Sequence, residues 1–380
     1  MLCSSLLLKL RPAQLLFLAV ACLFNTAVMA QSAHFVYVVN ELSDSVSGYS
    51  INAASGELTP VPGSPFLTSH MPHRLVISPS GTHAYLVTDD SSVARLVTFF
   101  IDRNTGALTI KANQPLPSPS FAVPSIEPSG RLLLLANSRT GEVSFYGLDP
   151  SSGIPSLIGA VQAGNSPWSS TIDSFGKFVF VAGNSNRVAG YAVDAQNRTL
   201  TAVSGSPFVV RNLTAVAGHR PMSQIAVAHP SENFLYVTDP IAGNISAFAV
   251  DRSNGSIHPL AGSPFSAHGL IPFDALIAHG RFLYAGDWHR GVIGAFSIDG
   301  SGGLAPVAGS PFPVPFTSGS AGSGGTAISV DPSGRFLYAT STEKNEITAF
   351  RIDPSTGILM PLPGGPLPTG KHPFRIAVSP

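Results

Sequence analysis

The sequence predicts an all-β protein in which one four-stranded unit is repeated seven times around a ring. Three features of the 380-residue chain support this: an apolar strand that recurs seven times, a turn phrase that follows each copy, and a repeat length of 44 to 58 residues. Repeats of this length, each forming a small antiparallel sheet, are typical of β-propeller blades. We therefore predict a seven-bladed β-propeller with four-stranded blades.

The recurring strand is rich in aromatic and β-branched residues, which favour β-structure. A short polar loop and a further strand follow each copy. The seven copies read FVYVVN from Phe35, AYLVTD from Ala84, LLLLAN from Leu132, FVFVAG from Phe178, FLYVTD from Phe234, FLYAGD from Phe282 and FLYATS from Phe336.

The recurring turn has the form of IDRNTG and IDPSTG, in which Asp or Asn opens the turn and a residue with positive φ closes it. The last strand of each unit comes next and often closes with Gly-Ser-Pro-Phe. We expect these residues to close the seven turns: Gly56, Gly106, Gly153, Asn197, Gly255, Gly303 and Gly357.

One further strand precedes each copy of the phrase, but only six such strands occur before the seven phrases. The last nine residues, HPFRIAVSP from His372 to Pro380, have the same character and nothing after them. We expect this C-terminal strand to join the N-terminal blade and close the ring, which leaves no open edge between the first and last blades.

Composition agrees with many short strands joined by tight turns, because glycine (37) and proline (33) are abundant and only 11% of residues are charged. No helical period is sustained after residue 30, and no linker is evident. We expect one domain over residues 31–380.

Residues 1–30 have the build of a secretory signal peptide, with a basic start, an apolar run of ten residues from Leu15 and a small-residue exit before Gln31. The run is too short to span a bilayer, so we expect a secreted or periplasmic protein without a membrane span. A lipid anchor at Cys22 is the minor alternative. Without the leader the net charge is about −2, which disfavours nucleic acid as a partner.

Functional groups are expected where two sets of loops meet on one face of the ring, the loops leading into the innermost strands and the loops after the recurring strand. We call this face the mouth. Crowding of polar residues for solubility would explain the pattern equally well. Six of the eleven histidines map to the mouth: His70, His73, His219, His268, His289 and His372. They are dispersed over several blades, so we predict neither a metal site nor a cofactor.

The phrases DPSGRFLY, IDPSTG and GSPF, which recur with variations around a ring of seven units, resemble the lactonase propeller family that includes bacterial 6-phosphogluconolactonases and fungal carboxymuconate-lactonizing enzymes. The resemblance covers nearly all of the chain after residue 30. It implies a lactone-hydrolysing site at the central channel mouth that uses histidine, glutamate and arginine. Asn40-Glu41-Leu42 matches the family's glutamate motif, and Pro72-His73 retains half of its His-Pro-His motif.

Lactone opening needs a base that activates water and a cation that holds the developing oxyanion. In the first blade we expect Glu41 or His372 to be the base, with Arg375 on the carbonyl or on a substrate carboxylate or phosphate. His73 and Arg74 in the next blade would reinforce them. The alternative is a structural ion pair between Arg375 and Glu41 that secures the ring closure.

A second candidate patch is Asp287-Trp288-His289-Arg290 in the sixth blade, where an aromatic side chain beside three ionisable ones suits ligand binding. The alternative is that Trp288 only caps the strands beneath it. The motifs of serine hydrolases, nucleotide-binding loops and zinc proteases are missing from the sequence. Three functions remain open: an exported lactonase acting on a small-molecule lactone, a non-catalytic binding module for a sugar or protein, and a structural propeller.

Overall fold

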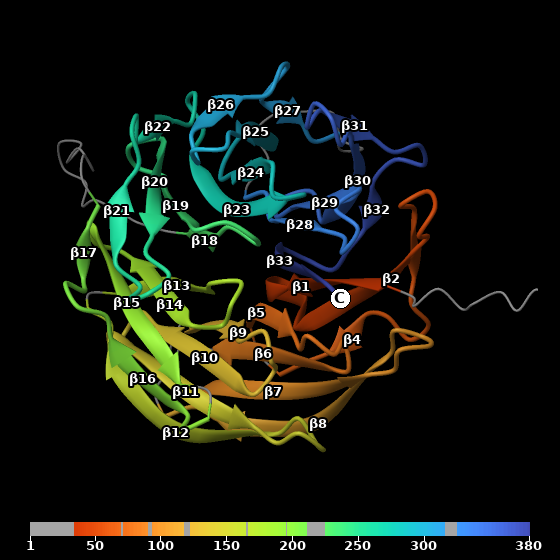
Figure 1. The fold of residues 1–380 in the computed structure, drawn as a ribbon. Helices are drawn as coiled ribbons and strands as arrows, with labels where there is room; N and C mark the ends of the chain where they lie inside the picture. Colours follow the sequence, from red (N-terminus) through yellow and green to blue (C-terminus); the bar gives the residue numbers. More distant parts are fainter. Residues whose placement is uncertain are drawn as a thin grey trace, which may run out of the picture.

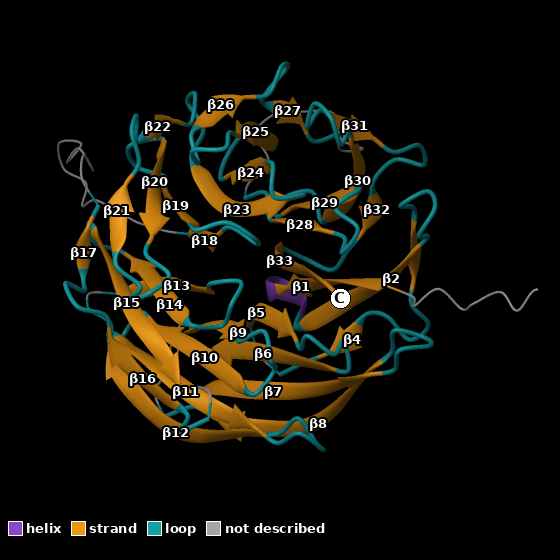
Figure 2. Ribbon diagram, viewed as in Figure 1, coloured by secondary structure: helices purple, strands orange, loops and turns teal. Residues whose placement is uncertain are grey.

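The computed structural model is a ring of seven antiparallel sheets around a central axis (Figure 1). It describes residues 34–69, 71–89, 93–117, 122–164, 166–194, 196–210, 225–315 and 325–380. Among these residues the regular elements are strands, apart from one 3-10 turn, η1 (Glu41–Ser43), beside β1 (Figure 2). The prediction of an all-β seven-bladed propeller is confirmed.

Each blade has four antiparallel strands, and the innermost strands of neighbouring blades contact one another around the axis. The strands of blades 1 to 4, from the axis outward, are β33 (Pro373–Val378), β1 (His34–Asn40), β2 (Ser45–Ile51) and β3 (Leu58–Pro60); β5 (Pro72–Ile77), β6 (His83–Asp89), β7 (Ala94–Ile101) and β8 (Leu108–Pro115); β9 (Ala122–Ile126), β10 (Leu132–Asn137), β11 (Glu142–Leu148) and β12 (Pro155–Gln162); β13 (Pro167–Ile172), β14 (Phe178–Gly183), β15 (Arg187–Asp194) and β16 (Thr199–Ala202).

Blades 5 to 7 repeat this order, from the axis outward. Their strands are β18 (Ala226–Ala228), β19 (Phe234–Asp239), β20 (Asn244–Val250) and β21 (Ile257–Pro259); β23 (Pro272–Ala278), β24 (Phe282–Asp287), β25 (Val292–Ile298) and β26 (Leu304–Pro306); β28 (Ile328–Val330), β29 (Phe336–Ser341), β30 (Glu346–Ile352) and β31 (Leu359–Pro361).

The Gly-Ser-Pro-Phe phrase interrupts the outer edge of a blade instead of closing a single strand. In five blades a short strand follows the outer strand and pairs with the third strand, whereas β8 and β12 run unbroken for eight residues. The serine hydroxyl of the phrase accepts a hydrogen bond from the third strand, as Ser64 does from Gly48 N at 2.9 Å. The short strands are β4 (Phe66–Leu67), β17 (Phe208–Val209), β22 (Phe265–Ser266), β27 (Phe312–Pro313) and β32 (Leu367–Pro368).

The C-terminal strand closes the ring as predicted. β33 pairs antiparallel with β1, with Val36 opposite Val378 and Val39 opposite Arg375. Ser379 extends the pairing, because Phe35 N donates to Ser379 Oγ and Ser379 N donates to Phe35 O, both at 2.8 Å. The first and last segments of the ring therefore share one sheet.

Neighbouring blades are joined by buried tyrosines that reach from the second strand of one blade to the turn of the next. Tyr338 Oη of blade 7 donates to Gly56 O of blade 1 at 3.1 Å, which joins the two ends of the repeat. Desolvation of these buried phenols raises their pKa values strongly. The other four pairs, at 2.8–3.0 Å, are Tyr37 with Gly106, Tyr85 with Gly153, Tyr236 with Gly302 and Tyr284 with Gly357.

The same turns need glycine for two reasons, backbone conformation and contact with an aromatic ring. Gly357 has φ 75°, and a Cβ placed there would lie 2.4 Å from the Phe282 ring of blade 6. Two of the predicted turn-closing residues were wrong by one position. In blade 4 the left-handed residue is Arg198 instead of Asn197, so the bend falls one residue later. In blade 6 it is Gly302 instead of Gly303, so the bend falls one residue earlier.

Candidate functional site

Glu41 lies between two imidazoles at the mouth of the ring. Its Oε1 is 2.8 Å from Nδ1 of His73, and its Oε2 is 2.8 Å from Nδ1 of His372. The glutamate side chain is 12% exposed, His73 2% and His372 33%. The three residues come from two blades, and ring closure is what brings them together.

The backbone fixes Glu41 against the segment that carries His372. Glu41 N donates to His372 O at 3.0 Å, and Leu42 N donates to Lys371 O at 3.2 Å. The buried Asn40 accepts a hydrogen bond from Gly370 N at 3.1 Å through its Oδ1. The 3-10 turn and the loop leading into β33 therefore form one hydrogen-bonded unit.

The two imidazoles keep Glu41 ionised. Burial by itself raises the pKa of this carboxyl, but hydrogen bonds from His372 and His73, and their charge, outweigh burial and lower the pKa from 4.5 to about 2. A carboxylate held this far below its usual pKa is a weak base at neutral pH. It is better suited to orienting an imidazole and stabilising its protonated form.

The two histidines have different surroundings. His73 Nε2 lies 3.3 Å from the carbonyl oxygen of Asp89 while its Nδ1 faces Glu41, so both ring nitrogens meet acceptors. His372 gives Nδ1 to Glu41, and its ring is one-third exposed at the mouth. With a proton on Nδ1, the lone pair of His372 lies on Nε2, where it can accept a proton.

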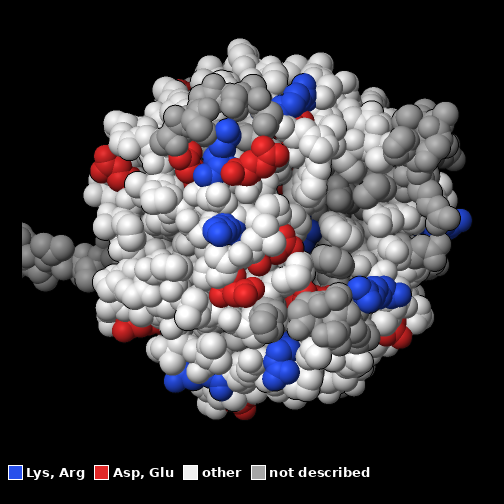
Figure 3. All heavy atoms as spheres, turned by 180° about the vertical axis from the view of Figure 1, so that it is seen from behind, with Lys and Arg blue, Asp and Glu red and all other residues white. Residues whose placement is uncertain are grey.

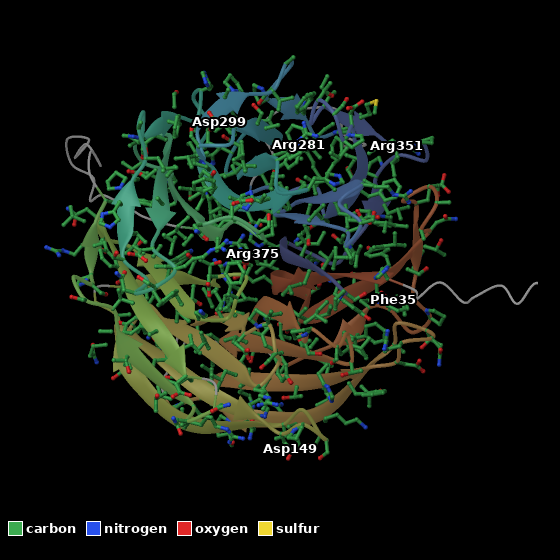
Figure 4. The ribbon with its side chains drawn as sticks, viewed as in Figure 1. Phe35, Asp149, Arg281, Asp299, Arg351 and Arg375 are labelled. Atoms are coloured by element: carbon green, nitrogen blue, oxygen red, sulfur yellow. The ribbon has the colours of Figure 1, made fainter. Side chains whose placement is uncertain are left out.

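Arg375 is buried near the axis, where Figure 4 labels it. Its guanidinium lies 4.1 Å from the Phe273 ring centroid and 4.7 Å from that of Phe374, and Nη1 donates to Phe374 O at 3.1 Å. Within the described part of the chain, Nε and Nη2 find no hydrogen-bond partner. Burial lowers the pKa of this guanidinium, while Asp274 and Glu41 nearby act in the opposite direction.

Arg74 occupies the position in blade 2 that Arg375 occupies in blade 1, because both follow a Pro and one further residue at the start of an innermost strand. Burial and the charge of Arg375 lower the pKa of Arg74 well below its usual value, and Asp274 opposes this. Two arginines thus share a site in which the charge of Asp274 acts on both and that of Glu41 on Arg375. No ion pair joins Glu41 to Arg375 in the described structure, because the glutamate pairs with the imidazoles instead.

Aromatic rings join the two predicted patches into one surface. The Phe374 ring is 5.9 Å from His372 and nearly parallel to it, 5.7 Å from Phe273 and 6.4 Å from Trp288. Phe273 and Trp288 are in contact, with centroids 3.8 Å apart. Trp288 of blade 6 is therefore continuous with the Glu41 site of blade 1.

Blade 7 has a small residue at the position of Phe374. The hydrogen bond from Thr342 N to Gly325 O in blade 7 corresponds to the one from Glu41 N to His372 O in blade 1. Ala327, two residues after Gly325, therefore takes the position that Phe374 takes in blade 1. By the same pattern Trp288, whose N donates to Ile271 O, stands where blade 1 has Glu41. The sequence analysis did not include Phe273 and Phe374, although their place after Pro272 and Pro373, matching His73 after Pro72, was a signal for them.

The side chains of Asp287 and Arg290, next to Trp288, stabilise the loop that carries it. Asp287 is fully buried and accepts hydrogen bonds from the backbone of Ile271, His289 and Arg290, which outweigh burial and lower its pKa. Arg290 pairs with Asp287 at 3.1 Å, and His289 is exposed. A ligand role for Asp287, His289 and Arg290 stays a prediction, while Trp288 has direct contact with the site.

A cavity of about 600 Å³ lies at the opposite end of the innermost strands, lined by residues such as Ile77, Ile277, Val330 and Val378. These residues are at the far ends of their strands from Glu41. Asp331, the acidic residue in this lining, is occupied by hydrogen bonds from Ser333 and Phe336. The carboxylate in this lining is thus bound within its own turn, unlike Glu41, whose partners are two imidazoles.

Several predicted features lie outside the described residues, namely the leader peptide, His70 and His219. No group of His, Cys, Asp or Glu side chains placed to hold a metal ion is found in the described ranges, nor a helix long and apolar enough to cross a membrane. Figure 3 shows one face with acidic and basic side chains scattered over a largely uncharged surface.

The fold and the site together define a class, a seven-bladed propeller in which a carboxylate, two imidazoles and two arginines gather where blades 1 and 2 meet. The family described as "Lactonase, 7-bladed beta-propeller" matches residues 26–124, 66–167 and 122–217, which together make up half of the chain. The chain belongs to this family.

Relatives and solved structures agree with this membership. A 6-phosphogluconolactonase of Yersinia pestis is 22% identical, covering 90% of this chain and 97% of its own, and that of Xenorhabdus nematophila is 24% identical, covering 90% and 98%. The periplasmic gluconolactonase of Pseudomonas aeruginosa has a TM-score of 0.71 at 19% identity, covering 92% of this chain and 99% of its own. A Bacteroides uniformis protein has a TM-score of 0.75 at 18% identity, covering 92% and 100%.

Proposed function

We propose that this protein is an exported lactonase that hydrolyses a sugar lactone or a related ester at the channel mouth. The observation that carries the proposal is the single carboxylate, Glu41, that contacts Nδ1 of both His73 and His372 at 2.8 Å. In this arrangement Glu41 orients His372, and His372 acts as the general base.

The reaction follows from these roles. His372 Nε2 takes a proton from a water molecule while the water oxygen forms a bond to the lactone carbonyl carbon. When the tetrahedral intermediate collapses, the bond between that carbon and the ring oxygen breaks. The imidazolium returns its proton to the leaving oxygen, which yields the open-chain hydroxy acid. Glu41 stabilises the imidazolium formed between the two steps.

Arg375 is assigned to stabilise the negative charge that develops on the lactone carbonyl oxygen. Its Nε and Nη2 are buried without partners among the described residues, so they can donate to an oxyanion without first losing other hydrogen bonds. Arg74 adds positive charge to the same site, and His73 holds the second oxygen of Glu41. An anionic group of the substrate, carboxylate or phosphate, would be attracted by the same two arginines.

Export belongs to the proposal as well. Residues 1–30 are the proposed signal peptide and residues 31–380 the propeller, so the site would face the periplasm or the medium. A phosphorylated sugar is seldom found there, so a non-phosphorylated sugar lactone is the preferred substrate. The Pseudomonas aeruginosa neighbour, which is described as a periplasmic gluconolactonase, supports this preference.

A non-catalytic binding propeller is the second candidate, and the aromatic surface favours it. Trp288 and Phe374 are partly exposed beside charged groups and contact the buried Phe273, and such aromatic rings suit stacking on a sugar ring. In that case the ligand would bind without being consumed, and binding would depend on Trp288.

The test is hydrolysis of a panel of sugar and acyl lactones by the purified protein, with ligand binding measured on the same panel. We expect turnover that falls about 10²- to 10³-fold in Arg375→Ala, as for the loss of an oxyanion donor. Saturable binding without turnover on every lactone, lost in Trp288→Ala, would instead establish the binding propeller.

A further inference from the structure

One position recurs just before the third strand of the blades. Its carbonyl accepts a hydrogen bond at 2.8 or 2.9 Å in six blades, from the residue after the short strand in five of them and from the residue after β12 in blade 3. In blades 3, 5 and 6 this position is a glycine with φ between 59° and 75°. Blade 4 has Asn186 there, without positive φ. The left-handed backbone at this position therefore explains the preference for glycine.

Blades 1 and 7 depart from this preference. Asp44 has φ 47° and Asn345 has φ 58°, although glycine would adopt these angles with less strain. Both side chains are used in the same way. Asp44 Oδ1 accepts from Met71 N at 2.9 Å, and Asn345 Oδ1 accepts from His372 N at 2.7 Å. Each acceptor lies 27 residues before its donor.

The two donors have an uncommon backbone conformation, which Ser166 before Pro167 in blade 4 shares. Met71 has φ 42° and His372 has φ 54°, and each precedes a proline, a setting that disfavours helical backbone angles. Such a conformation persists only where the surroundings hold it. The loops that Asp44 and Asn345 hold lead directly to His73 and His372, the two imidazoles on Glu41.

We propose that Asp44 and Asn345 are positioning residues, each reaching from one blade into the next to set one imidazole on Glu41: Asp44 sets His73, and Asn345 sets His372. The consequence for turnover rests on the proposed lactonase function. The geometric claim does not, because it concerns only where the two rings lie.

The test is the ring ¹⁵N spectrum of histidine-labelled protein, with signals assigned through His73→Gln and His372→Gln. Asn345→Gly restores the residue that blades 3, 5 and 6 carry and removes the acceptor. We expect it to shift the His372 ring signals and leave those of His73 in place. Asp44→Gly should do the reverse. Asn345→Asp and Asp44→Asn keep the acceptor oxygen and should restore the original signals.

Asn186→Gly is the matched control, because it makes the same substitution at the equivalent, exposed position of blade 4. It should shift neither ring. If the glycine variants do not fold, Asn345→Ser and Asp44→Ser supply side chains that are too short to reach. The proposal is overturned if both rings shift equally in either variant, or if neither ring shifts.

Activity provides a second readout. If His372 is the base, Asn345→Gly should lower kcat by about 10- to 100-fold through misplacement of the ring, with a smaller change in KM. Reciprocal ring shifts in a protein that hydrolyses no lactone would uphold the positioning role and remove the lactonase proposal. Turnover in the wild type with unmoved rings in both glycine variants would remove the positioning role and uphold the lactonase proposal.

Discussion

Glu41 carries most of the chemistry of the site, since one carboxylate fixes two rings from two blades. Its pKa of about 2 suits an orienting group, and the proposed reaction assigns the base to the partly exposed His372. The choice between Glu41 and His372, which the sequence leaves open, depends on which side chains face the carboxylate. An arginine partner would have left His372 unoriented.

Replacing Glu41 with glutamine tests the orienting role. Glu41→Gln keeps the shape but removes the charge that stabilises the imidazolium, so we expect kcat to fall about 10³- to 10⁴-fold, as when the carboxylate of a catalytic triad becomes an amide. Steady-state kinetics on the best lactone of the panel measures this. A fall of less than tenfold would show that the carboxylate does not assist the base.

Stability should depend on pH through the same residue. The folded pKa of about 2 lies below the ordinary value of 4.5, so the stabilisation from Glu41 is fully present above about pH 4.5 and is lost as the pH falls through about 2. Urea unfolding between pH 2 and 5 should therefore show a steeper pH dependence in the wild type than in Glu41→Gln. Parallel profiles would contradict the depressed pKa.

At the scale of the elements, the turn after the third strand is where each blade meets its neighbour. An aromatic ring or histidine at the start of the second strand packs on the turn glycine of the next blade, as Phe336 does on Gly56. Blades 3 and 4 lack the tyrosine of the other five, and Arg198 replaces the glycine there. The repeat is therefore least regular between these two blades.

Gly357→Ala tests this packing. The added methyl group meets both a left-handed backbone and the Phe282 ring at 2.4 Å, so we expect a loss of about 2–4 kcal/mol in the free energy of unfolding. Gly364 also has a positive φ, 100°, but a methyl group added there would meet no atom within 4 Å. Gly300 has no positive φ, and a methyl group there would likewise meet no atom within 4 Å. Chemical denaturation should rank the three losses in that order; equal losses for Gly357→Ala and Gly364→Ala would remove the packing argument.

At the scale of the whole molecule, closure through β33 makes blade 7 and blade 1 ordinary neighbours. Tyr338 bonds to Gly56 across this junction just as Tyr284 bonds to Gly357 between blades 6 and 7. The ring therefore has no seam at its ends.

Two tyrosine variants test this equivalence. Tyr338→Phe and Tyr284→Phe each leave one buried carbonyl without its partner, which costs about 1–3 kcal/mol, and we expect the two losses to agree within about 0.5 kcal/mol. Thermal or urea unfolding supplies the comparison. A much larger effect at Tyr338 would mean that the closure is the weak point of the ring.

The sequence predicted the ring well because its repeats, turns and unpaired last strand are local signals. It also named Glu41, His73, His372, Arg74 and Arg375, which ring closure brings to one mouth. It did not reveal that the blade 1 and blade 6 patches are continuous. That contact joins Phe374 of blade 1 to Phe273 and Trp288 of blade 6, a relation between side chains far apart in the sequence that no local pattern records.

The most direct test of the account is the hydrolysis rate of a sugar δ-lactone by the wild-type protein and by His372→Gln, each corrected for spontaneous ring opening. The account predicts turnover in the wild type and a loss of about 10²- to 10⁴-fold in the variant, the usual contribution of a general base. Wild-type activity that survives in His372→Gln would contradict the role of His372, and the absence of turnover in the wild type would contradict the lactonase itself.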